Sequence, residues 1–71
     1  MKLHYYPETD SLYIELNPRP SADSWEISAG VVLDVDADGN PVGLDIDRAS
    51  QLLDLTSLET VALPAATTQN A

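Results

Sequence analysis

The sequence contains no cysteine, so neither a disulfide nor a thiolate metal site can form. Basic residues are also scarce: Lys2, Arg19 and Arg48 stand against twelve acidic residues, for a net charge of −9. A surface with this charge repels the phosphates of nucleic acids and of anionic lipids, and attracts basic proteins. The three glycines are isolated, which leaves no glycine-rich phosphate loop. We therefore expect no nucleic-acid partner, no membrane partner and no cofactor.

Long apolar runs are absent as well. No stretch approaches the roughly 18 apolar residues of a membrane span, and the N-terminus lacks the pattern of a signal peptide. The sequence thus predicts a soluble protein, and the lack of cysteine is typical of the cytoplasm. A chain of 71 residues buries only about 60% of its unfolded surface. Domains of this size often need a disulfide, a metal or oligomerisation for stability.

Alternating apolar and polar residues predict a β-hairpin over residues 2–16, on either side of a Pro-Glu-Thr-Asp turn. A four-residue loop pairs Leu3 with Ile14 on one face. The same register pairs His4 with Tyr13 on the other face. Because apolar side chains meet apolar side chains, this register is the one that a half-buried hairpin requires.

A second hairpin is predicted over residues 31–47. Asp38-Gly39 at its centre is a strong hairpin signal, because glycine readily adopts a positive φ. A two-residue loop at this point pairs Val35 with Val42 and places the six apolar side chains of the two strands on one face. The opposite face then carries four carboxylates, those of Asp34, Asp36, Asp45 and Asp47.

Three further segments complete the predicted fold. A third strand is expected at residues 23–28, and a short helix of about two turns follows the second hairpin, with Asp47 as its N-cap. Residues 58–63 have the pattern of either a helix or a sixth strand. The sequence thus predicts one α+β domain over residues 1–63: an antiparallel β-meander of about five strands, one short C-terminal helix and a possible sixth strand. A flexible tail is expected at residues 64–71.

Two motifs resemble the pattern of a known family. Residues 5–14 read Tyr-Tyr-Pro-Glu-Thr-Asp-Ser-Leu-Tyr-Ile, which is similar to a Tyr-Asp-x-x-x-Asp-x-Leu-Tyr-Ile signature, and residues 30–50 are similar to the rest of the pattern. Together they resemble a bacterial family catalogued as domain of unknown function 2283. Tyr6 and Arg48 stand where that family often has aspartate. The family has no established activity, so the resemblance implies a fold over roughly residues 1–55 and no catalytic residues.

The aspartates of the second hairpin have the spacing of a calcium-binding loop. Asp34, Asp36 and Asp38 alternate before Gly39, and Asp45 comes at the twelfth position, as in an EF-hand. Strands rather than helices are expected on both sides, which disagrees with an EF-hand. Two interpretations follow: a solvated acidic face with a turn, or a weak divalent-cation site.

The remaining candidate residues form no catalytic set. His4 is the only histidine, and a hydrolase or isomerase would depend on it together with Tyr6 and Tyr13. No nucleophile with a histidine partner can be assigned from the spacing, so we assign no catalytic residue. Trp25 either fills the core or anchors an interface, since tryptophan is enriched at binding hot spots.

One short helix covers only part of a five-stranded sheet. The simplest remedy is a second copy of the chain, which gives an isologous homodimer. Together with the acidic charge, this predicts a small interaction module that binds a basic protein partner. A role like that of an antitoxin, which neutralises a small basic protein, would suit the size and the charge. Divalent-cation binding is the alternative.

Overall fold

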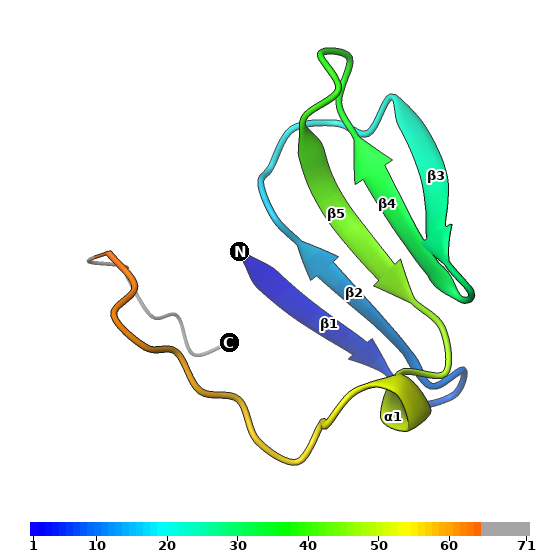
Figure 1. Ribbon diagram of the computed structural model, residues 1–71, viewed down its shortest axis with the longest axis vertical. Coiled ribbons are helices and arrows are strands. Elements are labelled where there is room, and N and C mark those ends of the chain that lie inside the picture. The colour runs from blue at the N-terminus through cyan, green and yellow to red at the C-terminus, as the bar shows by residue number, and fades with distance from the viewer. Residues whose placement is uncertain (65–71) are drawn as a thin grey trace.

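Five antiparallel strands form one sheet in the computed structural model, which describes residues 1–64 (Figure 1). The predicted five strands and short C-terminal helix are confirmed. The order across the sheet is β1-β2-β5-β4-β3. The predicted meander order is therefore wrong, because β2 lies beside β5 and not beside β3. In the described residues, no helix is long and apolar enough to cross a membrane. The elements are β1 (Lys2–Tyr6), β2 (Ser11–Glu15), β3 (Asp23–Ser28), β4 (Val31–Val35), β5 (Pro41–Ile46) and α1 (Ala49–Leu52).

The hairpin of β1 and β2 has the predicted register. Leu3 lies opposite Ile14, and His4 lies opposite Tyr13. The turn ends at Asp10, whose φ of 52° is in the left-handed region that aspartate adopts more readily than most residues. The period of two and the turn chemistry were therefore sufficient to predict this hairpin.

The hairpin of β4 and β5 departs from the prediction at its loop end. Its other pairs match, but Val35 lies opposite Pro41 and not opposite Val42. The loop therefore spans residues 36–40 instead of two residues, because the Asp36 carboxylate accepts backbone N–H groups from inside the loop. The register shift here leaves Val42 as an extra residue in β5, which is a β-bulge.

The strand pairing gives the sheet an inner and an outer face. The inner face carries α1, and the core lies where they meet: Leu12, Ile46 and Ala49 are buried there. Farther from α1 the inner face is only partly covered. There the register aligns one apolar side chain from each strand in a single row: Leu3, Ile14, Leu44, Leu33 and Trp25.

Asp10 holds the N-terminus of α1 from 40 residues earlier in the chain. The first backbone N–H of α1 donates to the Asp10 carbonyl oxygen at 2.8 Å. The backbone N–H and the hydroxyl of Ser50 donate to the Asp10 carboxylate at 3.1 and 2.6 Å, and the Tyr5 hydroxyl donates to it at 2.7 Å. The predicted cap, Asp47, is therefore wrong: Arg48 occupies the cap position without a side-chain bond, because the acceptor comes from the first hairpin.

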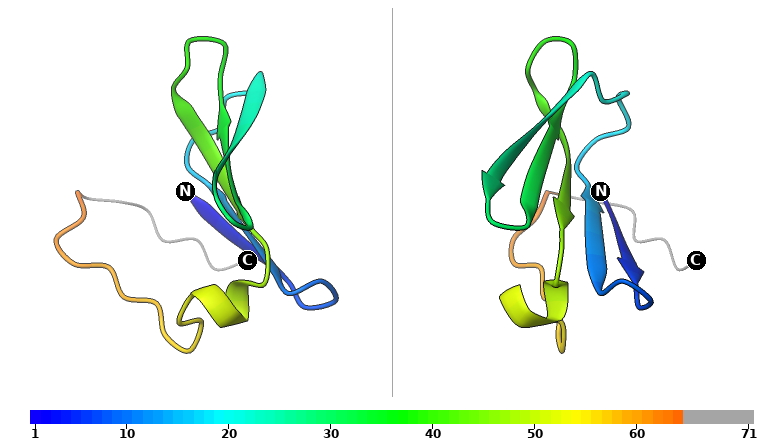
Figure 2. Two further views of the ribbon diagram at one scale, coloured as in Figure 1. Left: turned by 45° about the vertical axis from the view of Figure 1, so that its right-hand side comes forward. Right: turned by 90° about the vertical axis from the view of Figure 1, so that its right-hand side faces the viewer.

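The helix itself is shorter than predicted, with four residues instead of about two turns. After it, residues 53–64 form neither a helix nor a strand, which resolves the choice left open for residues 58–63. We call this segment the C-terminal arm. It extends away from all five strands, on the side of the sheet that carries α1 (Figure 2, left). Of the predicted tail, residues 65–71 lie outside the described residues.

Candidate functional site

Acidic side chains gather on the outer face of the sheet. The register aligns one row across this face, from His4 on β1 to Glu26 on β3, with Tyr13, Asp45 and Val32 between them. Glu26 and Asp45 are both exposed. The row takes residues from both hairpins, so it forms only because β2 of the first hairpin pairs with β5 of the second.

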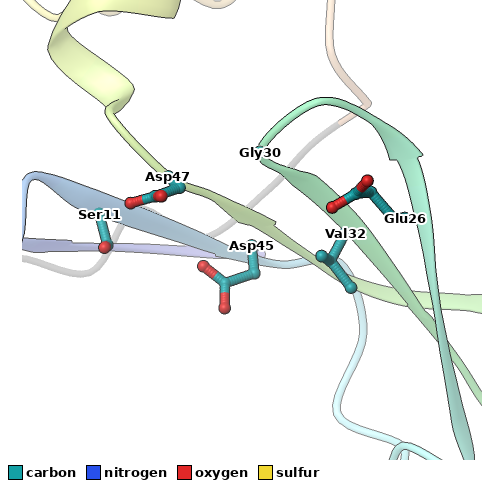
Figure 3. Close-up of a pocket in the computed structure, with 6 residues that line it drawn as sticks. All are labelled: Ser11, Glu26, Gly30, Val32, Asp45 and Asp47. Carbon is teal, nitrogen blue, oxygen red and sulfur yellow. The ribbon is translucent and has the colours of Figure 1, made fainter.

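A shallow pocket of about 280 Å³ lies in this acidic part of the outer face (Figure 3). Three of its lining residues, Glu26, Asp45 and Asp47, carry carboxylates, and all three are exposed. Figure 3 shows Asp45 between the Ser11 side and the Glu26 side of the pocket. Several carboxylates around one hollow complement the side chain of lysine or arginine, which forms charge-assisted hydrogen bonds with them. The geometry is therefore suited to bind a cationic group.

A hydrogen bond joins Tyr13 and Asp34 on the same outer face. The Tyr13 hydroxyl donates to Asp34 Oδ2 at 3.1 Å, and the Ser24 hydroxyl donates to Oδ1 at 2.6 Å. Tyr13 on β2 can reach Asp34 on β4 because Gly43, on the intervening β5, has no side chain: a Cβ there would lie 2.5 Å from Tyr13 Cζ. Burial raises the pKa of the Tyr13 phenol, and the bond to Asp34 raises it further. Through its two bonds, the Asp34 carboxylate on β4 links β2 and β3 to its own strand.

Asp36 closes the loop between β4 and β5 and is only 7% exposed. Its Oδ1 accepts the backbone N–H of Asp38 at 3.0 Å and that of Asn40 at 2.9 Å, and its Oδ2 accepts a bond from Arg19 Nη1 at 3.2 Å. These donors, first of all the N–H of Asn40, lower the pKa of Asp36. The prediction that Asp36 stands on the solvated acidic face is therefore wrong, since the carboxylate is turned into the loop.

The residues that carried the family resemblance have a structural role that sequence reasoning missed. Tyr5, Asp10 and Ser50 form one hydrogen-bonded cluster that fastens α1 to the first hairpin. A family model described as "Protein of unknown function (DUF2283)" matches residues 2–50. The chain belongs to the DUF2283 family. Neither a curated protein nor a solved structure matches it. The matched part runs from β1 to Ser50, so it contains both ends of this cluster.

The structure of this DUF2283 chain does not gather the aspartates of the predicted cation site. Asp34 and Asp36 are bonded as described, Asp38 is exposed in the loop, and Asp45 lines the outer pocket. Among residues 1–64, no group of three or more histidine, aspartate or glutamate side chains is arranged to hold a metal ion. Calcium binding stays a prediction, and calorimetric titration with calcium is its test.

Two further residues were singled out from the sequence. His4 lies opposite Tyr13 on the outer face, as the register predicts. Trp25 lies on the edge strand β3, opposite Leu33 on the inner face, and half of its surface is exposed. It is thus outside the buried core, and its role as an interface anchor stays a prediction.

Proposed function

We propose that this DUF2283 domain is a small interaction module that binds a basic protein partner through its outer face and forms a homodimer through its inner face. One observation carries the proposal: a single-layered sheet separates exposed carboxylates on one face from half-exposed apolar side chains on the other. Glu26 and Asp45 represent the first group, and Leu3 and Trp25 represent the second.

The outer face supports the choice of a basic partner. Carboxylates around a hollow raise the local negative potential, which speeds the approach of a cationic protein and orients it. The pocket lined by Glu26, Asp45 and Asp47 would receive a lysine or arginine side chain. A role like that of an antitoxin, which neutralises a small basic protein, agrees with the charge of −9. We expect this role in the cytoplasm, where proteins without disulfides are usual.

The inner face supports the choice of a homodimer. Stable domains bury the apolar face of a sheet against a second layer, and here the second layer is one helical turn. Leu3 and Trp25 stay 47% and 50% exposed at the two edges of the inner row. A second copy would supply the missing layer with an identical face, as an isologous interface does.

Affinity capture with matched charge variants tests the outer face. Asp45→Lys with Asp47→Lys changes the pocket, whereas Glu8→Lys with Asp38→Lys changes two exposed loop residues. Each replacement adds two charges, so both double variants have a net charge of −5 in place of −9. We expect a basic protein to be retained by the unmodified chain and by the loop variant, and to bind the pocket variant at least tenfold more weakly.

The same capture at rising salt concentration is a second test. Less of the basic protein should be retained as the ionic strength increases, because contacts between exposed charges weaken. Equal capture by the two double variants would mean that the net charge and not the pocket is recognised, and would refute the proposed site. Sedimentation of the unmodified chain tests the homodimer separately.

A further inference from the structure

The C-terminal arm carries apolar side chains that are more exposed than those of the inner face. Leu58 is 75% exposed, Val61 is 76% exposed and Leu63 is 54% exposed. Exposed apolar patches of this kind mark interaction sites in folded proteins. The chain therefore carries two unpartnered apolar surfaces on the same side of its sheet (Figure 2).

We propose that the arm of each copy lies across the inner face of the other, so that the dimer forms by reciprocal exchange of arms. This inference rests on the homodimer of the proposed function and specifies its contact. Exchange of identical segments about a two-fold axis closes the assembly, because each copy both gives and receives one arm.

Charge selects a second copy as the occupant of the inner face. The row from Leu3 to Trp25 is uncharged, although one carboxylate, that of Asp23 opposite Val35, lies on the same face at the edge of the sheet. A basic partner would find no complementary charge in that row. Two copies that met through their outer faces would repel each other, since each carries −9. Contact through the inner faces instead keeps the carboxylates apart and in water.

The exposed apolar area matches what a stable dimer needs. Eight large apolar side chains of the inner face and the arm are 38–76% exposed. Each offers roughly 50–120 Å², or on the order of 700 Å² in all. A standard interface buries about 800 Å² on each partner. The eight residues are Leu3, Tyr5, Trp25, Leu53, Leu55, Leu58, Val61 and Leu63.

The arm also has the direction and the length for exchange. Asp54 Oδ1 accepts the backbone N–H of Thr56 at 2.9 Å, which shapes the exit from α1, and the arm then runs clear of its own strands (Figures 1 and 2). Its twelve residues, 53–64, can extend to roughly 40 Å. Five strands spaced about 4.8 Å apart span only about 19 Å. One arm can therefore cross the whole inner face of a partner.

Sedimentation equilibrium on two matched arm variants tests the exchange. Leu58→Asp with Val61→Asp places charges on the apolar positions, whereas Ser57→Asp with Thr60→Asp places the same charges on polar positions of the same arm. We expect the unmodified chain and the polar-position variant to be dimers. The apolar-position variant should dissociate at least 100-fold more readily while its circular dichroism still shows the sheet. The emission of Trp25 should shift to the red when the arm is lost.

A mixing experiment distinguishes exchange from an arm that folds onto its own sheet. A face variant, Leu3→Asp with Trp25→Asp, has an unchanged arm. The arm variant, Leu58→Asp with Val61→Asp, has an unchanged inner face. Each should be monomeric alone, and an equimolar mixture should form heterodimers that hold one intact contact.

The outcomes separate this inference from the proposed function. A monomeric unmodified chain overturns the homodimer and the exchange together. A dimer that persists in the arm variant with unchanged affinity overturns the exchange and leaves the homodimer standing. A mixture of the two variants that stays monomeric overturns the exchange, because the intact arm of one variant then fails to bind the intact face of the other.

Discussion

Replacing Gly43 with alanine should loosen the outer face of the sheet through its effect on one tyrosine. The added Cβ would overlap the Tyr13 hydroxyl and lie 2.5 Å from Cζ of the same ring. The backbone of Gly43 is outside the left-handed region, so contact with Tyr13 is what opposes a side chain there. The ring must swing off β5, and it then releases the Asp34 carboxylate that its hydroxyl contacts at 3.1 Å.

The expected cost has two parts. Loss of the bond to Asp34 removes about 1 kcal/mol. Displacing the Tyr13 ring from β5 adds roughly 1 kcal/mol, which brings the sum within the 1–3 kcal/mol usual for overpacking. We therefore expect Gly43→Ala to lower the free energy of unfolding by about 2 kcal/mol, or Tm by about 8–16 °C for a chain of this size. Tyr13→Phe removes only the hydrogen bond and should lower it by about 1 kcal/mol.

A double-mutant cycle isolates the cause. In the Tyr13→Ala background the atoms nearest to the added Cβ are gone, so Gly43→Ala should become stabilising by about 0.4–1 kcal/mol, because alanine restricts the unfolded chain. Urea unfolding of the four proteins, followed by circular dichroism at one protein concentration, measures both values. The same loss of stability in both backgrounds would refute the role given to the Tyr13 ring.

Two further predictions concern carboxylates that organise turns. Bonds from the hydroxyls of Ser50 and Tyr5 lower the pKa of Asp10 below its ordinary 3.8, so its contribution to stability is present above that pH and is lost as the pH falls through the lowered value. The Tm deficit of Asp10→Asn should therefore be largest above pH 4 and shrink towards pH 2; a deficit constant from pH 6 to pH 2 would contradict this. Asp36→Ala should lower Tm more than Asp38→Ala, because Asp36 accepts the loop N–H groups; equal Tm values would contradict this assignment.

The two hairpins show which features of the fold local sequence patterns can predict. The register of the first could be predicted, including Leu3 opposite Ile14, because alternation and turn length together allow only one pairing. The loop end of the second could not, because the Asp-Gly signal describes two residues, whereas the Asp36 carboxylate binds backbone N–H groups across a five-residue loop. The bulge at Val42 follows from that larger loop.

The candidate site shows the same division. The alternation of residues in β5 was enough to place Asp45 and Asp47 on an acidic face. It could not show that Ser11 and Glu26 would line the same pocket, since these residues come from β2 and β3, which are not neighbours in the sheet. Sequence reasoning also missed the cap that Asp10 provides for α1, although this residue belongs to the motif that resembled the family.

The sequence by itself determined which side chains share a face, because a β-strand alternates its residues strictly and each hairpin closes through its own turn. Only the tertiary structure decided that β2 pairs with β5, that Asp10 caps a helix 40 residues later, and that the two ends of the inner row, Leu3 and Trp25, stay about half exposed. These features depend on contacts between segments distant in the chain, which local periodicity does not encode. The two differently charged faces result from both: local alternation sorts the residues, and long-range pairing brings them together.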